Sequence, residues 1–399
     1  MKVYYYHTID IRNVYQQWRN GTFPGHFLYG ATHLRNEGID VVMKINRYLD
    51  FRNMNIIEKR DINNFAGMFP LAEMLRERRF VITGATGLLG ACMVKCLLAL
   101  NKRYSLDLHV TSVVRNKEKA LRIFGEETAS HDFYIYDFAS SESFSPSDEA
   151  DYIVHFASPT ASRYFLEYPV ETIVTGIRGT EKVLEYASSH SVKSMAYISS
   201  LEVYGTVYDD ATPLTEDQQG YINPIDARSS YPIGKRAAEC LCHAYAVEKS
   251  LPVRIARLAQ TFGAGVSKDD NRVFAQFARS IISGSDIILH TTGELSRCYC
   301  YTIDAISSIL YILLKGKDGE AYNVANEDTY ISIVDMARYL CTEFNPDVKP
   351  VIELKEGMGY SPVTKLRLST EKMRSLGWTP MYNMHDMFAN LIESLRADL

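Results

Sequence analysis

Three glycines at a fixed spacing constrain the fold of this chain more than any other feature. They lie between two apolar segments, Phe80–Thr83 and Ala91–Leu100, that have the lengths of a strand and a helix. Such a turn lets the backbone approach a pyrophosphate closely, and the N-terminus of the helix supplies amide donors and positive potential. The motif therefore predicts a strand–turn–helix unit that binds a dinucleotide. We expect its contacts to come from Gly84, Thr86, Gly87, Leu88, Leu89 and Gly90.

The rest of the chain continues the strand–helix alternation that builds a parallel sheet. The further predicted strands are Leu108–Val114, Phe133–Tyr136, Tyr152–Phe156, Ser194–Ile198 and Val253–Arg257. The further predicted helices are Val170–Ser189, Tyr231–Glu248, Arg272–Ile282, Ile333–Glu343 and one after Pro380. We expect an α/β fold, with a Rossmann-type doubly wound parallel sheet and a smaller C-terminal α/β lobe that binds the substrate.

Three regions follow from this pattern. Residues 1–53 form an N-terminal extension of unknown role, whose strand–helix–strand pattern weakly resembles the start of a glycosyltransferase. A fused segment, an extra lobe and a partner-docking arm are all compatible with it. Residues 54–257 are expected to form the dinucleotide-binding domain, which also carries the catalytic residues. Residues 258–399 are expected to form the substrate-binding lobe, interleaved with the sheet.

Composition excludes several classes of protein. The net charge of -5 gives no electrostatic reason to expect a nucleic-acid or membrane partner. No apolar run reaches the roughly 18 residues of a membrane span, and the N-terminus lacks a signal-peptide pattern. The seven cysteines include two Cys-x-Cys pairs but no zinc-site spacing, so we expect them to pack in the core without a metal. These features predict a cytoplasmic protein.

The identity of the dinucleotide depends on the ends of the second and third strands. Arg115 stands where an acidic residue would bind the ribose 2′-hydroxyl of NAD. It either pairs with the 2′-phosphate of NADP, stacks on adenine or faces solvent. Asp137 either accepts from the adenine amino group or caps the next turn. We expect NAD, with NADP as the alternative that Arg115 supports, and further contacts from Phe138, Phe156, Ala157 and Ser158.

A tyrosine and a lysine four residues apart are the first catalytic candidates. Tyr231 and Lys235 share one face of a predicted helix. A phenol is a poor base at neutral pH unless a neighbouring cation favours the phenolate. Lys235 can provide that cation while holding a nicotinamide ribose. An exposed helical pair is the structural alternative.

Two further candidates follow the fifth strand, where open α/β sheets bind their ligands. Ser200 can hydrogen-bond the hydroxyl or carbonyl group that reacts. Glu202, in the same turn, is suited to proton transfer at the adjacent carbon or to holding a water. Its alternative is a solvated acid in a loop.

These motifs together resemble the extended short-chain dehydrogenase/reductases, the NAD-dependent epimerase/dehydratase family, from about Arg79 to the C-terminus. The resemblance implies that Ser200, Tyr231 and Lys235 form a catalytic triad and that Arg297 grips a nucleotide diphosphate. It also implies a nucleotide-sugar substrate linked to UDP, and a homodimer formed through the helices near 170–189 and 231–248.

Within this family, four segments resemble UDP-glucuronate decarboxylases: His155–Pro159, Ser200–Gly205, Asn223–Arg228 and Tyr231–Glu239. The resemblance adds Ser158, Arg228 and Arg272 to the expected substrate contacts. This chain departs from the decarboxylases at three places. Gln260 replaces an asparagine that contacts the substrate, Gly263–Val266 loses an arginine, and Arg115 replaces an acid.

Several reactions remain open. Decarboxylation gives Glu202 a chemical role, whereas a 4-epimerase would need only the triad and room for the sugar to rotate. A 4,6-dehydratase would need an acid where this chain has Leu201. A non-catalytic NAD(P)-binding sensor or scaffold would not need the full triad, and an NADP-dependent reductase would rely on Arg115.

Overall fold

The computed structural model describes residues 54–147, 149–159, 162–355 and 363–397. The predicted elements of residues 1–53 lie outside these described residues. None of the helices in the described ranges has the length and apolar character that a membrane span requires.

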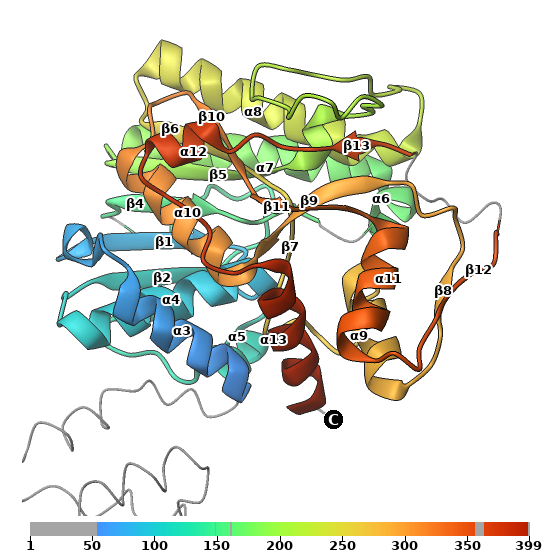
Figure 1. The fold of residues 1–399 in the computed structure, drawn as a ribbon. Coiled ribbons are helices and arrows are strands. Elements are labelled where there is room, and N and C mark those ends of the chain that lie inside the picture. The colour runs from blue at the N-terminus through green and yellow to red at the C-terminus, as the bar shows by residue number, and fades with distance from the viewer. Residues whose placement is uncertain (1–53, 148, 160–161, 356–362, 398–399) are drawn as a thin grey trace, which may run out of the picture. The chain divides into compact units, whose positions relative to one another are not determined.

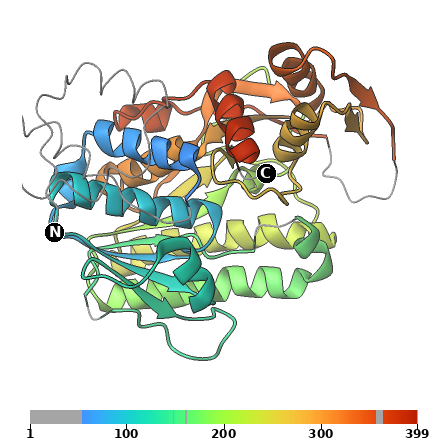
Figure 2. The same ribbon diagram turned by 90° about the horizontal axis from the view of Figure 1, so that it is seen from below.

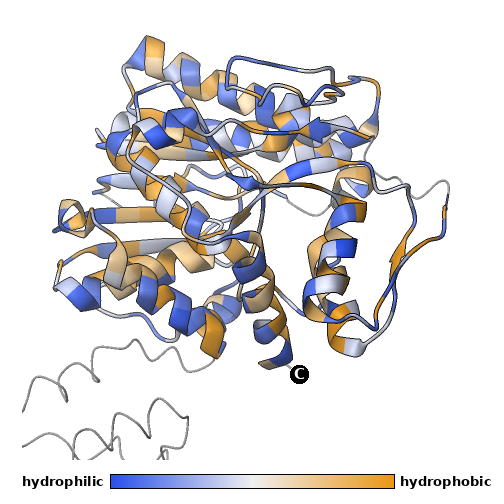
Figure 3. Ribbon diagram, in the orientation of Figure 1, coloured by the Kyte–Doolittle hydropathy of each residue, from blue (hydrophilic) through white to orange (hydrophobic). Residues whose placement is uncertain are grey.

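A seven-stranded sheet, parallel throughout, lies at the centre of the described part (Figure 1). Its spatial order is β10-β6-β5-β4-β1-β2-β3, so the first six strands have the Rossmann order. Buried apolar side chains dominate the strands, as expected for a parallel sheet covered on both faces. Figure 3 shows most of β1 in the colour of hydrophobic residues. The strands are β1 Arg79–Thr83, β2 His109–Val114, β3 His131–Ile135, β4 Tyr152–His155, β5 Ser194–Ser200, β6 Val253–Leu258 and β10 Ala321–Val324.

Helices cover both faces of this sheet (Figure 2). One layer contains α3 (Ile56–Met68), α4 (Leu88–Tyr104) and α10 (Thr302–Lys315), and the other contains α7 (Pro169–Ser189) and α8 (Ser230–Lys249). Each layer has its own cluster of buried apolar side chains against the sheet. Two shorter helices, α5 Lys117–Phe124 and α6 Ser162–Glu167, lie in the connections.

A smaller lobe is built from the C-terminal part of the chain. Its central strand, β9 (Ser296–Tyr301), pairs in parallel with β7 (Gln260–Phe262) and β13 (Lys365–Leu366) and antiparallel with β11 (Asn326–Ser332). A second pair joins β8 Ile287–Leu289 to β12 Pro350–Ile352. The helices of this part are α9 Val273–Ser283, α11 Ile333–Phe344, α12 Glu371–Ser375 and α13 Met384–Ala397.

The predicted fold class is confirmed. All six predicted strands are present, and the predicted helices correspond to α4, α7, α8, α9, α11 and α13. The sequence did not predict α10 and β10, which return from the C-terminal part to complete the large sheet and its cover. Of the 14 residues of α10, 12 are buried, so this helix is part of the core of the described chain.

Candidate active site

The carboxyl ends of β1, β4 and β5 meet at one edge of the large sheet. The chain leaves β1 toward β2 on one side and reaches β4 on the other, so this edge is the switch point at which such sheets bind ligands. The glycine turn follows β1, residues 156–158 follow β4, and Ser200 ends β5. The fold therefore brings the predicted cofactor and catalytic segments together.

The glycine turn requires glycine at two of its positions. Gly84 has a φ of +64°, and a Cβ there would lie 2.8 Å from the backbone nitrogen of Ala157. A Cβ on Gly90 would lie only 2.3 Å from the carbonyl oxygen of Gly84. The helix α4 begins at Leu88, and Gly87 before it provides no side-chain cap for the first amides. Those amides suit an anionic group, so the turn fits the pyrophosphate of a dinucleotide.

The segment after β4 lies against this turn. The backbone nitrogen of Ala157 donates to Oγ1 of Thr83 over 3.1 Å, and that hydroxyl contacts Nδ1 of His155 at 2.7 Å. Burial, with the charge of Lys235, lowers the pKa of His155 to about 3, so its ring is neutral. Phe156 and Ser158 flank Ala157 and are half-buried.

The remaining predicted cofactor contacts lie at the ends of β2 and β3. Arg115 and Asp137 are both exposed. Oδ1 of Asp137 accepts a hydrogen bond from the backbone nitrogen of Ala139 over 3.0 Å. This contact fits the alternative in which Asp137 caps the next turn. Phe138 is buried instead, with its ring centroid 5.4 Å from that of His155. It lies in the layer between the sheet and α7.

Tyr231 and Lys235 lie in the first turns of α8, directly beside β5. Nζ of Lys235 donates to the carbonyl oxygen of Ile198 over 2.7 Å and lies 5.8 Å from the centroid of the Tyr231 ring. Burial lowers the pKa of Lys235 to about 8 and raises the pKa of Tyr231. The carboxylate of Glu202 raises the pKa of Tyr231 further, so without ligands its phenol is protonated.

Ser200 connects the end of β5 to the tyrosine. Its hydroxyl accepts from the backbone nitrogen of Glu202 over 3.2 Å and so caps the short 3-10 helix η2 (Leu201–Tyr204). It also hydrogen-bonds the phenol of Tyr231, which opposes the rise in the pKa of that group. The structure thus brings three of the predicted catalytic side chains, Ser200, Tyr231 and Lys235, together at the end of β5.

Glu202 is paired rather than solvated. Nη2 of Arg228 lies 3.0 Å from its Oε1 and 2.7 Å from its Oε2. The two side chains are 29% and 16% exposed, so the pair is partly shielded from water and still reachable. Arg228 comes from η3 (Ala227–Ser229), which the side chain of Asp226 caps.

An aromatic residue that the sequence did not predict connects these groups. The ring of Phe165, on α6, stacks on that of Tyr231 with centroids 4.3 Å apart and planes 7° apart. The guanidinium carbon of Arg228 lies 5.0 Å from the centroid of Phe165. A single aromatic residue in a six-residue helix carries no signal in the sequence, because only the folded chain places it beside Tyr231.

The predicted substrate-binding residues of the C-terminal lobe fall into two groups. Nη1 of Arg297, on β9, donates to Oε1 of Gln260, on β7, over 3.2 Å. Nε of Arg297 is buried and has no hydrogen-bond partner among the described residues. Arg272 precedes α9 and pairs instead with Asp270 at 2.6 Å. The structure therefore brings Gln260 and Arg297 together and leaves Arg272 in a local ion pair.

Comparison with known families gives one match that spans most of the large sheet. The model of the NAD dependent epimerase/dehydratase family matches residues 80–325. This range contains the glycine turn and all four catalytic candidates. None of the groups of His, Cys, Asp and Glu among the described residues has the arrangement of a metal site.

Similar curated proteins include two UDP-glucuronic acid decarboxylases. Decarboxylase 1 of Xenopus tropicalis is 27% identical over 344 residues, which cover 84% of this chain and 77% of that protein. Decarboxylase 6 of Arabidopsis thaliana is 28% identical over 339 residues, which cover 83% of this chain and 94% of that protein.

Solved structures share the fold at lower identity. UDP-glucose 4-epimerase from Thermotoga maritima, with UDP-glucose, has a TM-score of 0.65 at 20% identity and covers 80% of this chain and 99% of its own. dTDP-glucose 4,6-dehydratase from Streptomyces venezuelae, with NAD bound, has a TM-score of 0.64 at 21% identity and covers 80% and 97%.

Proposed function

Because the chain belongs to the NAD-dependent epimerase/dehydratase family, we propose that it converts UDP-glucuronate to a UDP-pentose by decarboxylation through a transient 4-keto sugar. NAD, bound on the glycine turn, would accept a hydride from C4 of the sugar and later return it. The curated relatives named UDP-glucuronic acid decarboxylases support this choice of reaction.

The side chains at the end of β5 have the roles that oxidation at C4 needs. Tyr231 takes the proton of the C4 hydroxyl as hydride leaves the same carbon. The charge of Arg228 lowers the pKa of Tyr231 and so favours the phenolate, and the ammonium of Lys235 lies 5.8 Å from the Tyr231 ring as a second cation. Ser200 holds the oxygen that becomes the ketone. Once C4 is a ketone, the C6 carboxylate is that of a β-keto acid.

The pair formed by Glu202 and Arg228 is the observation that carries the proposal. The C5–C6 bond breaks, carbon dioxide leaves, and the bonding electrons delocalise onto the C4 oxygen, which Ser200 and Tyr231 stabilise. Arg228, 2.7 Å from Glu202, provides a cation for the C6 carboxylate before that step. Glu202 assists delivery of the proton to C5, after which the hydride returns to C4. A 4-epimerase acting on a neutral sugar would need neither charge.

Two other features bear on the choice of substrate and reaction. Leu201 occupies the place of the acid that a 4,6-dehydratase needs, and it is buried, so dehydration is disfavoured. Arg297, whose buried Nε lacks a partner among the described residues, supplies a donor for the nucleotide diphosphate together with Gln260. Arg272 would have to leave Asp270 to join them.

An NMR time course of the purified protein with UDP-glucuronate, with and without added NAD, tests the proposal. We expect release of carbon dioxide and formation of a UDP-pentose, and at least a 100-fold loss of rate in both Tyr231→Phe and Glu202→Gln. A six-carbon product inverted at C4 would identify a 4-epimerase. Net oxidation or reduction of the dinucleotide would identify a reductase, and no turnover at all would favour a sensor or scaffold.

A further inference from the structure

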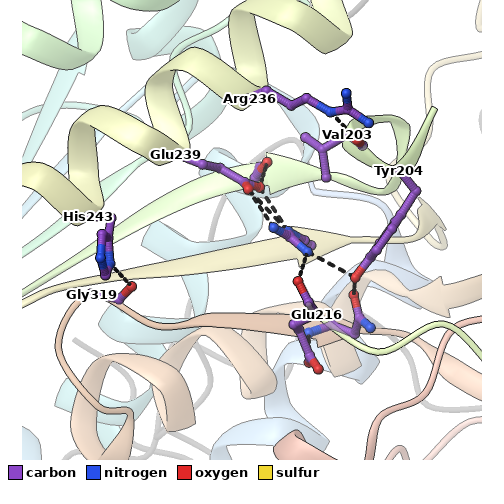
Figure 4. Close-up of polar contacts among 10 residues, drawn as sticks. Val203, Tyr204, Glu216, Arg236, Glu239, His243 and Gly319 are labelled. Atoms are coloured by element: carbon purple, nitrogen blue, oxygen red, sulfur yellow. Dashed lines mark hydrogen bonds and ion pairs between the residues drawn. The ribbon is translucent and has the colours of Figure 1, made fainter. Parts of the chain in front are cut away.

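A network of buried polar side chains joins α8 and β6 to the short helix η2 (Figure 4). At its centre the carboxylate of Glu239, on α8, pairs with the guanidinium of Arg257, on β6, with 2.8 Å between Oε2 and Nη2. Both residues are almost completely buried. Replacing such a pair by apolar residues is often neutral or stabilising, so stability alone is a poor explanation for it.

The network reaches the strand that ends at the catalytic serine. The hydroxyl of Ser199 donates to Oε1 of Glu239 over 2.5 Å, and Ser199 is paired with Arg257 in the register of β5 and β6. Glu239 therefore accepts hydrogen bonds from two adjacent strands. Since Ser200 follows directly, the backbone that aims its hydroxyl at Tyr231 is anchored to α8.

The same network holds the turn that carries Glu202. Nη1 of Arg257 donates to the hydroxyl of Tyr204 over 3.1 Å, and that hydroxyl donates to Oδ1 of Asn323 over 2.7 Å. From α8, Nε of Arg236 donates to the carbonyl oxygen of Val203 over 2.6 Å. In Figure 4 Arg236 reaches Val203, and the Tyr204 ring extends away from both. The turn is thus held by hydrogen bonds to α8, β6 and β10.

Glu239 also lies one helical turn after Lys235, facing the same strand. The other titratable groups that face the ammonium are His155 on β4, Tyr197 on β5, and Tyr231 and Cys242 on α8. Burial keeps the imidazole unprotonated and raises the pKa of both phenols and of the thiol, so all four are neutral near pH 7. Glu239 is therefore the negative charge that faces Lys235 among the described residues.

We propose that Glu239, Arg257 and Tyr204 form a positioning unit, which fixes the Ser200–Glu202 turn against α8 and keeps Lys235 charged. These residues touch neither substrate nor cofactor and act through Ser200, Glu202 and Lys235. The inference rests on the proposed catalytic site, but not on which nucleotide sugar reacts there.

The first test is Tyr204→Phe, which removes one hydroxyl and keeps the ring. We expect kcat to fall about 10-fold with KM within 2-fold, because the turn loses its hydrogen bonds to β6 and β10 while the substrate contacts remain. Tyr322→Phe is the matched control: Tyr322 is equally buried, its hydroxyl accepts from the backbone nitrogen of Lys317 over 2.8 Å, and it stands on β10. Equal kcat values for the two variants would overturn the positioning role.

The second test is the pH profile of Glu239→Gln. Loss of the carboxylate lowers the pKa of Lys235, so the alkaline limb of kcat is expected to move down by about one pH unit. Glu239→Asp, which keeps the charge, should lower kcat without moving that limb. An unmoved limb in Glu239→Gln, or equal movement in both variants, would overturn the electrostatic role.

Binding of NAD provides a readout that does not require the proposed reaction. Lys235 can hold the nicotinamide ribose only in its charged form, so the affinity of the wild type for NAD is expected to fall as the pH rises past that pKa. In Glu239→Gln the fall should occur about one pH unit lower, as measured by fluorescence titration. If UDP-glucuronate is not converted but this shift is present, the proposed function fails and the positioning unit stands. If UDP-glucuronate is converted but the shift is absent, the proposed function stands and the positioning unit fails.

Discussion

Among single residues, Lys235 is the one whose buried charge most directly lowers the free energy of unfolding. Its ammonium is buried, with the carbonyl of Ile198 as a hydrogen-bond partner and Glu239 one turn away. Burial lowers its pKa from 10.5 to about 8. Between these two values the unfolded chain binds more protons than the folded chain, so the free energy of unfolding rises with pH across that window. Below it, the buried charge costs about 3 kcal/mol.

We therefore expect Lys235→Met to stabilise the ligand-free protein while it abolishes turnover. The free energy of unfolding should rise by about 1–3 kcal/mol at pH 7, and this gain should shrink as the pH approaches 10.5, where the unfolded lysine is also neutral. Denaturant titrations of both proteins at pH 7 and pH 9.5 provide the measurement. A variant less stable than the wild type at pH 7 would show that the ammonium is compensated by its partners.

At the scale of elements, the sequence could predict features whose pattern lies within one strand or helix, but not contacts between segments far apart in the chain. Six of the seven strands of the large sheet were predictable because each contains a short apolar run between turn signals, and Tyr231 and Lys235 were predictable because both lie on one helix face. The pair of Glu202 and Arg228 was not predictable as a contact, since only the fold brings η3 beside η2. The helix α10 and the strand β10 were missed as parts of the large sheet and its cover, since only the fold returns the chain from its C-terminal part to that sheet.

The glycine turn provides a prediction about the junction of β1 and α4. Gly90→Ala would place a Cβ 2.3 Å from the carbonyl oxygen of Gly84, and neither backbone segment can move without opening the turn. We expect a loss of NAD binding and a lower Tm. Gly67→Ala in α3 is the control, because its Cβ meets only the flexible guanidinium of Arg103 at 3.4 Å or more. It should raise the free energy of unfolding by up to about 1 kcal/mol. Thermal unfolding with and without NAD distinguishes the two; a Gly90→Ala protein that still binds NAD would contradict the assignment of the turn.

At the scale of the whole molecule, the layer of α7 and α8 presents an apolar outer surface. The two helices pack against each other on one face of the large sheet (Figure 2). Val170 and Val174, one turn apart on α7, are 74% and 36% exposed. Half-buried apolar side chains accompany them on both helices: Ile173, Ile177, Ile233, Leu241 and Tyr245. Exposed apolar side chains one turn apart on a helix suit a contact with another protein surface.

We expect this surface to pair with its counterpart in a second copy of the chain, since two helices meeting their symmetry mates bury all four apolar faces at once. Light scattering should give twice the 45.3 kDa of one chain. Val174→Glu would bury a carboxylate on each side of the two-fold axis and should yield a monomer. Ile288→Glu, at a residue 40% exposed on β8, should leave the dimer intact. A monomeric wild type would remove the expectation, whereas a dimeric Val174→Glu would place the contact on another face. Tyr231 lies in the first turn of α8, so a dimer through this layer would also stabilise the helix that aligns the phenol with Ser200. We therefore expect the monomeric variant to be less active than the wild type.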